Sequence, residues 1–249
     1  MLEPQRVVFA LKSLFPHLQR AEIDVADTPD QASSITMMIG AQLSAILHFG
    51  FPIPPDTLEW SLGNEIMWKE AGSDFAASQA HLLILAVGDQ QDLMQRREAS
   101  RTVSQLVAAV VSLYPLAGVL WTPSDVVIEP QRFMKEAVAA KQKHWPVDLW
   151  FGLEWYRGIA FEKDKAIVCR TRGIGYFASR ELECGPVAME PPQLGTKVQG
   201  LGRYIILSGR IFSDGDTVQL GSKAQQAASI SYEASRCGSL APVMKVVLT

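Results

Sequence analysis

The chain of 249 residues is 48% hydrophobic and 20% charged, which is typical of a globular protein and excludes a disordered one. Its 23 Lys and Arg against 26 Asp and Glu give a formal charge of −3, which argues against direct binding to nucleic acid over a large surface. The three cysteines have no C-x-x-C spacing. Neither a disulfide framework nor a zinc site is therefore expected, and a reducing, cytoplasmic location is favoured.

Apolar periodicity in the first third of the chain predicts two helices around a hairpin. The segments are a helix over residues 5–20, strands over 34–39 and 42–49, and a helix over 56–71. Gly40 lies near the hairpin turn, Pro55 begins the second helix, and Gly72 is expected to end it.

The clearest pattern in the chain is a strand, a helix and a second strand. Residues 81–87 form a continuous apolar run, and a helix over 92–114 follows, capped by Asp92 or Asp89. A short apolar strand comes next, so a right-handed parallel βαβ crossover is predicted over residues 81–121. One side of the helix is apolar, and the other is predicted to carry its polar residues: Arg96, Arg97, Arg101 and Gln105.

A further helix begins at Pro130, and beyond Trp145 the pattern changes to short strands around one more helix. The segments are strands over 149–156, 166–169, 217–220, 228–235 and 243–248 and a helix over 192–209. The fold class is therefore predicted as mixed α/β or α+β, with mixed sheets and packed helices. Two subdomains are expected, 1–146 and 147–249, with a single compact domain as the alternative.

Two long uncharged stretches, residues 31–55 and 102–124, contain polar residues and prolines. Neither offers the roughly 20 predominantly apolar residues that a spanning helix requires, so no membrane segment is expected.

Three motifs that are similar to ligand-binding loops each lack a required part. Residues 195–200 have the glycine spacing of a phosphate loop, but Leu201-Gly202 stands where its lysine belongs. Gly173 to Ala178 matches G-x-G-x-x-A without a long helix after it, and Asp214-Gly215-Asp216 lacks the further ligands of a calcium loop. The four histidines are far apart in sequence. No cofactor, metal or catalytic constellation is therefore predicted.

Two groups of residues remain as candidates for a site. Glu181 and Glu183 would point to the same side of a strand, where two acids can do acid/base chemistry, bind a cation or form a solvated strand face. Trp150, Trp155 and Tyr156 lie close in sequence, either as core anchors or as an aromatic surface for a protein partner. These five residues are the candidate partner-binding residues.

Several segments stand in an order and spacing that is similar to a known family: Thr36-Met37-Met38-Ile39-Gly40, Pro52-Ile53-Pro54, Trp68, Ala80-His81-Leu82, Trp121, Thr171-Arg172-Gly173-Ile174-Gly175-Tyr176-Phe177, Glu181-Leu182-Glu183 and Asp214-Gly215-Asp216-Thr217. Over roughly residues 34–220 the chain resembles the bacterial domain-of-unknown-function family 4261. Ala178 departs from the family's pattern, which often has glycine there. Members look like companions of secreted polymorphic toxins, so the resemblance implies an immunity-type role and no residue roles.

The first functional hypothesis is a non-enzymatic binding protein. It would be an immunity protein that neutralises a cognate secreted toxin encoded next to it, with a type VI secretion nuclease effector as one candidate. A mildly acidic surface suits a basic toxin. Two alternatives stay open: an enzyme that uses Glu181 and Glu183 with a histidine brought near by folding, and an adaptor or chaperone for secreted cargo.

Overall fold

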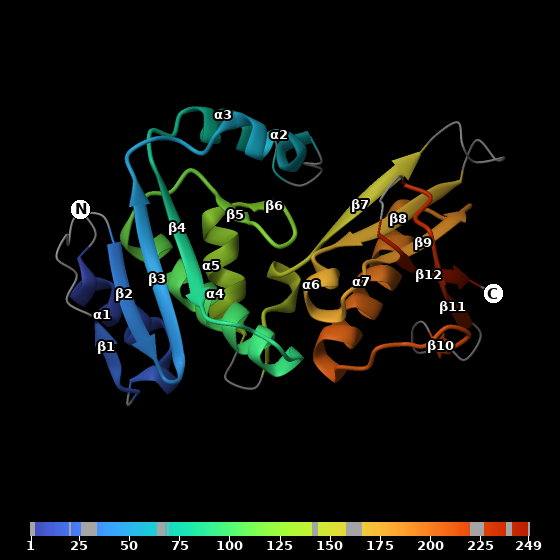
Figure 1. Cartoon of the computed structure of the whole chain (residues 1–249). Helices are drawn as coiled ribbons and strands as arrows, with labels where there is room; N and C mark the ends of the chain where they lie inside the picture. Colours follow the sequence, from blue (N-terminus) through green and yellow to red (C-terminus); the bar gives the residue numbers. More distant parts are fainter. Residues whose placement is uncertain are drawn as a thin grey trace. The chain divides into compact units, whose positions relative to one another are not determined.

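The computed structural model is shown in Figure 1. The structure describes residues 3–19, 21–25, 34–63, 68, 70–140, 144–157, 166–219, 227–237 and 241–248. Contacts divide the chain into two units, residues 1–149 and residues 150–249, whereas the sequence predicted the boundary at 146/147. Each unit combines helices with strands, and the sheets contain both antiparallel and parallel pairs, so the predicted mixed fold is confirmed.

The first unit contains a four-stranded antiparallel sheet in the order β1-β2-β3-β4. Its strands are β1 (Ile23–Val25), β2 (Ser34–Ile39), β3 (Gln42–Phe49) and β4 (His81–Val87). The predicted hairpin is confirmed as β2 and β3. Gly40 lies at its turn with φ +60, a left-handed conformation that glycine adopts without strain.

Helices cover one face of this sheet (Figure 1). They are α1 (Pro4–Leu14), the 3₁₀ turn η1 (Pro16–Leu18), α4 (Leu93–Leu113) and α5 (Pro130–Ala139). The long helix α4 packs on β3 and β4, and α1 and α5 pack on α4. Asp92 caps α4 as predicted, because its side chain accepts a hydrogen bond from the Gln95 amide while the Gln95 side chain accepts one from Asp92.

Because α4 is packed on several sides, two residues of its predicted polar side are buried. Arg97 is 7% exposed and Gln105 is 6% exposed, which corrects the prediction that this side of the helix carries its polar residues outward. The reason is tertiary, since α1 and α5 flank a helix whose sequence alone shows only one apolar face.

A second, smaller core forms elsewhere in this unit. Its elements are α2 (Pro55–Gly63), α3 (Ala71–Ala76), β5 (Val119–Trp121) and β6 (Val126–Ile128). Leu58, Ala71 and Phe75 are its buried centre. Gly72 lies inside α3, so the prediction that it ends a helix is wrong, and part of the predicted 56–71 helix lies outside the described residues.

The predicted parallel crossover over residues 81–121 is also wrong. The order strand, helix, strand is present as β4, α4 and β5, but β4 belongs to the four-stranded sheet, and among the described strands β5 pairs with β6 alone. The reason is local: β6 follows β5 after a short turn, and an antiparallel hairpin closes at lower entropic cost than a long crossover.

The second unit is a six-stranded mixed sheet in the order β10-β11-β12-β9-β8-β7. Its strands are β7 (Gly152–Arg157), β8 (Ile167–Arg172), β9 (Leu182–Val187), β10 (Thr217–Gln219), β11 (Ala227–Glu233) and β12 (Val243–Leu248). Among the described strands, β12 and β9 are the parallel pair and the other neighbours are antiparallel.

The helix α7 (Pro191–Ser208) covers one face of this sheet, close to the predicted 192–209 (Figure 1). Its buried side consists of Leu194, Val198, Leu201, Ile205 and Ile206 with two glycines. A Cβ at Gly195 would lie 3.1 Å from the Trp155 ring, and one at Gly202 would lie 2.9 Å from the Phe151 ring. Of the two glycines tested as a phosphate loop, Gly195 is therefore a contact point between helix and sheet, whereas nothing lies within 4 Å of a Cβ at Gly200.

Two short helical segments complete the described elements: η2 (Val147–Leu149) at the end of the first unit and α6 (Ile174–Ala178) in the second. In the described ranges no helix has the length and apolar character needed to cross a membrane.

Candidate functional site

A row of charged and polar residues crosses the second unit's sheet on the face opposite α7. Strand register places five residues side by side on adjacent strands: Glu154 of β7, Arg170 of β8, Glu183 of β9, Lys245 of β12 and Ser231 of β11. We call these five residues the charged row. The charges alternate in sign along it, so each acid lies between or beside bases.

The members of the charged row are more buried than their chemistry predicts. Glu183 is fully buried, and Glu154 and Lys245 are 4% and 6% exposed. Buried charges require partners, because desolvation of an unpaired ion costs several kcal/mol. Hydrogen bonds within the second unit supply partners for Glu183, Glu154 and Lys245, whereas the Nε of Arg170 is buried without an acceptor among the described residues.

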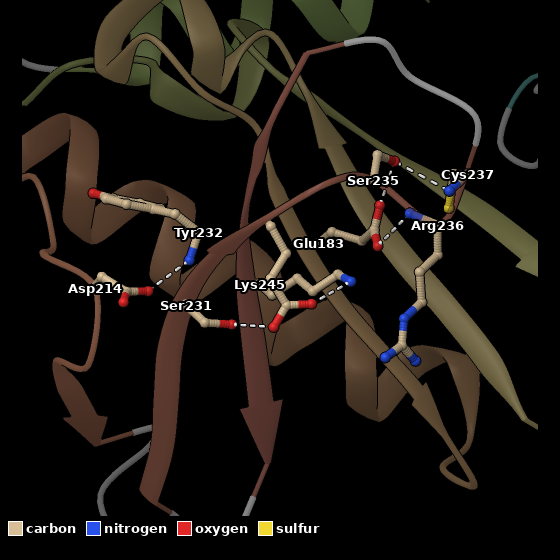
Figure 2. Close-up of polar contacts among 9 residues, drawn as sticks. Glu183, Asp214, Ser231, Tyr232, Ser235, Arg236, Cys237 and Lys245 are labelled. Carbon is tan, nitrogen blue, oxygen red and sulfur yellow. Dashed lines mark hydrogen bonds and ion pairs between the residues drawn. The ribbon is translucent and has the colours of Figure 1, made fainter.

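Glu183 is held by the segment that follows β11 (Figure 2). One carboxylate oxygen accepts a 2.6 Å hydrogen bond from the Ser235 hydroxyl, and the other accepts a 3.1 Å bond from the Arg236 amide. Ser235 also accepts a bond from the Cys237 amide. The carboxylate therefore ties residues 235–237 to the sheet, and both of its oxygens are engaged.

Lys245 and Glu154 are held in the same way. The Lys245 ammonium donates to Glu233 at 2.7 Å, and Glu233 also accepts a bond from Ser231 (Figure 2). Glu154 accepts a 3.0 Å bond from Arg172 and a 2.8 Å bond from the Tyr156 hydroxyl. Burial, together with this bond and the charge of Glu154, raises the pKa of Tyr156 to about 12.

Glu181 has a separate structural task at the start of α6. Its carboxylate accepts hydrogen bonds from the amides of Gly173, Ile174 and Gly175 at 2.9, 3.2 and 2.9 Å and from the Thr171 hydroxyl at 2.7 Å. Burial raises the pKa of the Glu181 carboxyl, and the bonds from Thr171 and the glycine amides oppose that rise. The G-x-G motif thus forms a nest of amides that the chain's own carboxylate fills.

The structure does not bring the two predicted acids together. Glu181 binds the start of α6, whereas Glu183 binds residues 235–236, so they share no partner among the described residues. The same part of the chain contains no group of three His, Cys, Asp or Glu side chains arranged as metal ligands.

The aromatic candidates are not a surface cluster. Trp150 is fully buried and stacks on Phe177 at 5.5 Å, which corrects its prediction as a partner-binding residue and supports the core-anchor alternative. Trp155 is half-buried, with its ring beside Gly195 of α7. Tyr156 is half-buried, and its hydroxyl is bound to Glu154.

The reactivity of the Cys237 thiol can report on the charge of Glu183, a member of the charged row. Burial and the neighbouring Glu183 carboxylate raise the pKa of the Cys237 thiol to about 12, because a negative neighbour disfavours the thiolate. Glu183→Gln removes that charge and is expected to lower the pKa of the Cys237 thiol. Alkylation by iodoacetamide at pH 8 should then be about threefold faster for each unit of pKa lost, because the thiolate fraction rises about tenfold while the nucleophilicity of the thiolate falls.

Mass spectrometry of each cysteine peptide measures this effect. Cys169 and Cys184 are fully buried and should stay protected in the variant. Glu233→Gln is the matched control, because Glu233 is exposed and contributes nothing to the raised pKa of Cys237. Unchanged labelling of Cys237 in Glu183→Gln would contradict the assigned role of the carboxylate.

A different surface, which the sequence did not single out, lies on the first unit's sheet. The face that α4 covers holds buried residues such as Ile35, Met37 and Ile46. The opposite face carries Ser34 and Thr36 on β2 and the buried Ala45 on β3. It also carries a set of apolar side chains that are half-buried or exposed: Met38, Leu43, Leu47, Phe49, Leu83, Leu85 and Val87. We call this set the open sheet face. Leu83 and Val87 are 39% and 38% exposed.

Strand register makes the open sheet face continuous. Leu43 lies opposite both Met38 and Val87, and Leu47 lies opposite Leu83. An antiparallel sheet with one covered face ordinarily presents polar residues on the other. A contiguous apolar patch of this kind marks an interaction surface.

Aromatic rings extend one end of this face. Phe49 stacks on His81 at 4.8 Å, and Phe51, which is 54% exposed, packs edge-on against His81 at 5.2 Å. The His81 Nδ1 lies 2.8 Å from the Phe51 carbonyl oxygen and holds the corner in place. Rigid aromatic side chains of this kind are the usual anchors of protein interfaces.

Charge is distributed unequally between the two units. Residues 1–149 contain 11 Lys and Arg and 17 Asp and Glu, a formal charge of −6, whereas residues 150–249 contain 12 and 9, a formal charge of +3. Two exposed acids lie beside the open sheet face. Asp24 of β1 is opposite Met38 of β2, and Asp89 lies just beyond β4. The surface is therefore apolar within an acidic unit.

No protein-family model, no curated protein and no solved structure matches this chain. The resemblance noted in the sequence therefore stays a prediction.

Proposed function

We propose that this protein acts by binding another protein, and that it is an immunity protein which neutralises a secreted bacterial toxin by direct contact. The observation that carries the proposal is the open sheet face, an apolar surface on an antiparallel sheet whose other face is already covered by α4. The exposed Leu83, Val87 and Phe51 are its expected anchors.

Charge favours a basic partner. The first unit has a formal charge of −6, and opposite charges on two partners accelerate their encounter and select the correct one. A nuclease must itself present positive charge to the phosphates of its substrate. A type VI secretion nuclease effector therefore fits this surface better than a toxin with a neutral or acidic active surface.

The predicted acids support binding over catalysis. All oxygens of Glu181 and Glu183 accept hydrogen bonds from the protein, and the two carboxylates lie at different places. Their arrangement serves the packing of the second unit, so they do not form the shared acid pair that the enzymatic alternative needs.

Co-expression with the product of the neighbouring gene tests the proposal. The expected result is a complex that survives size-exclusion chromatography and restores growth to cells that express that product. An adaptor or chaperone would promote export of the product and leave its toxicity intact. Absence of a complex together with absence of rescue would exclude the immunity function.

A further inference from the structure

We propose that Arg97, a buried arginine near the start of α4, binds a small oxyanion, either a phosphate or sulfate group or a carboxylate. The site lies in the first unit and is independent of the open sheet face. The inference rests on an arginine that is 7% exposed and of which two donor atoms have no acceptor among the described residues.

The two donors without a partner are the Nε and Nη2 atoms of Arg97. They form one edge of the planar guanidinium group, with both N–H bonds pointing the same way. Two oxygens of a carboxylate or phosphate match that edge in a bidentate arrangement. A single water molecule accepts less well at such an edge, because it cannot place two acceptor atoms side by side.

Leaving this edge empty is energetically costly. A buried polar group without a hydrogen-bond partner is rare in folded proteins, and a buried charge without a counter-ion is rarer still. Burial lowers the pKa of Arg97 from its ordinary value, but arginine remains protonated in proteins, so the charge cannot be relieved by loss of the proton. A bound anion supplies both the missing acceptors and the missing charge.

A second arginine with an unsatisfied donor lies on the same helix. Arg101, one helical turn further along α4, pairs with Glu98 and lies over the Trp145 ring at 5.2 Å, and its Nε is also buried without an acceptor. Its charge and burial lower the pKa of His17, with burial as the larger cause. Glu98 pairs with Arg101, and among the described residues no acceptor is bound to the Arg97 Nε or Nη2 atoms.

Thermal unfolding of the full chain tests the site. Phosphate, sulfate and acetate are added separately at constant ionic strength, with chloride as the balancing anion. At about ten times Kd the wild type should show a saturable rise in Tm of about 3–6 °C. A response to phosphate and sulfate identifies a phosphoryl-type ligand, and a response to acetate alone identifies a carboxylate.

Arg97→Gln and Arg97→Met should abolish the anion-dependent rise. Arg132→Gln is the matched control, because Arg132 is an exposed arginine on α5 that pairs with Glu136, and it should respond like the wild type. If the Arg97 variants do not fold, NMR of the wild type decides the question through the arginine Nε–Hε signals. The Arg97 signal should shift with phosphate or acetate and not with chloride.

Two results would overturn the proposal. One is the absence of any rise in Tm and of any shift of the Arg97 signal with all three oxyanions, each tested up to about 100 mM, which is well above the millimolar Kd of a weak site. The other is an equal response in wild type and Arg97→Gln, which would show that the anions act elsewhere.

Discussion

Glu181→Ala is expected to lower the free energy of unfolding of the second unit by at least about 3 kcal/mol. The substitution leaves three backbone amides and the Thr171 hydroxyl without their common acceptor, and each orphaned donor that stays buried costs about 1–3 kcal/mol. Because α6 has only five residues, it has little helical stability of its own to compensate.

Urea unfolding followed by circular dichroism gives the free energy, and hydrogen exchange over residues 171–182 locates the loss. Glu181→Gln should cost less, since its amide oxygen still accepts from the glycine amides. Glu190→Ala is the control, because the exposed Glu190 side chain forms no capping bond at the start of α7. Equal stability of Glu181→Ala and Glu190→Ala would contradict the structural role of Glu181.

Gly185→Ala has the second large expected effect, a loss of at least about 3 kcal/mol. Gly185 has φ +117, a conformation in which an L side chain is strained. Its Cβ would also lie 2.5 Å from the Ile167 carbonyl oxygen, an atom of the neighbouring strand that cannot move without shifting the sheet.

Gly40→Ala is the matched control for this substitution. Gly40 also has a positive φ, +60, but nothing lies within 4 Å of the added Cβ, so only the backbone strain of about 1–2 kcal/mol remains. The difference in unfolding free energy between the two variants isolates the steric contact. A difference close to zero would mean that the strands adjust without cost.

The elements that sequence predicts well here are those with strong local signals. The hairpin of β2 and β3 and the helix α4 with its Asp92 cap follow from periodicity and capping residues, whereas the helix α7 was predicted although three glycines weaken its helical signal. Partner choice between strands is not local, and for that reason β5 was assigned to a crossover with β4 although it pairs with β6.

Candidate sites were harder to predict than elements. The charged row joins five strands that are far apart in sequence, so only its member Glu183 was singled out, and its partners in residues 235–236 gave no signal. Trp150 was taken from a local cluster of aromatics, and only packing on Phe177 shows that it is a core residue.

The open sheet face could have been found from the sequence of β4. The β4 sequence HLLILAV is apolar at both parities, which indicates a strand with two apolar faces. Sequence alone does not tell which of these faces a helix covers. The structure answers that question by placing α4 on one of them.

The most direct test of binding through the open sheet face is the affinity of the double variant Leu83→Asp/Val87→Asp for the product of the neighbouring gene. Both side chains are exposed, so the fold should tolerate the change, and Phe9→Asp, at a residue that is 73% exposed on α1, is the control. Calorimetry should show that Kd rises by about 30-fold or more in the double variant and is unchanged in the control. A double variant that binds as tightly as the wild type would contradict the account.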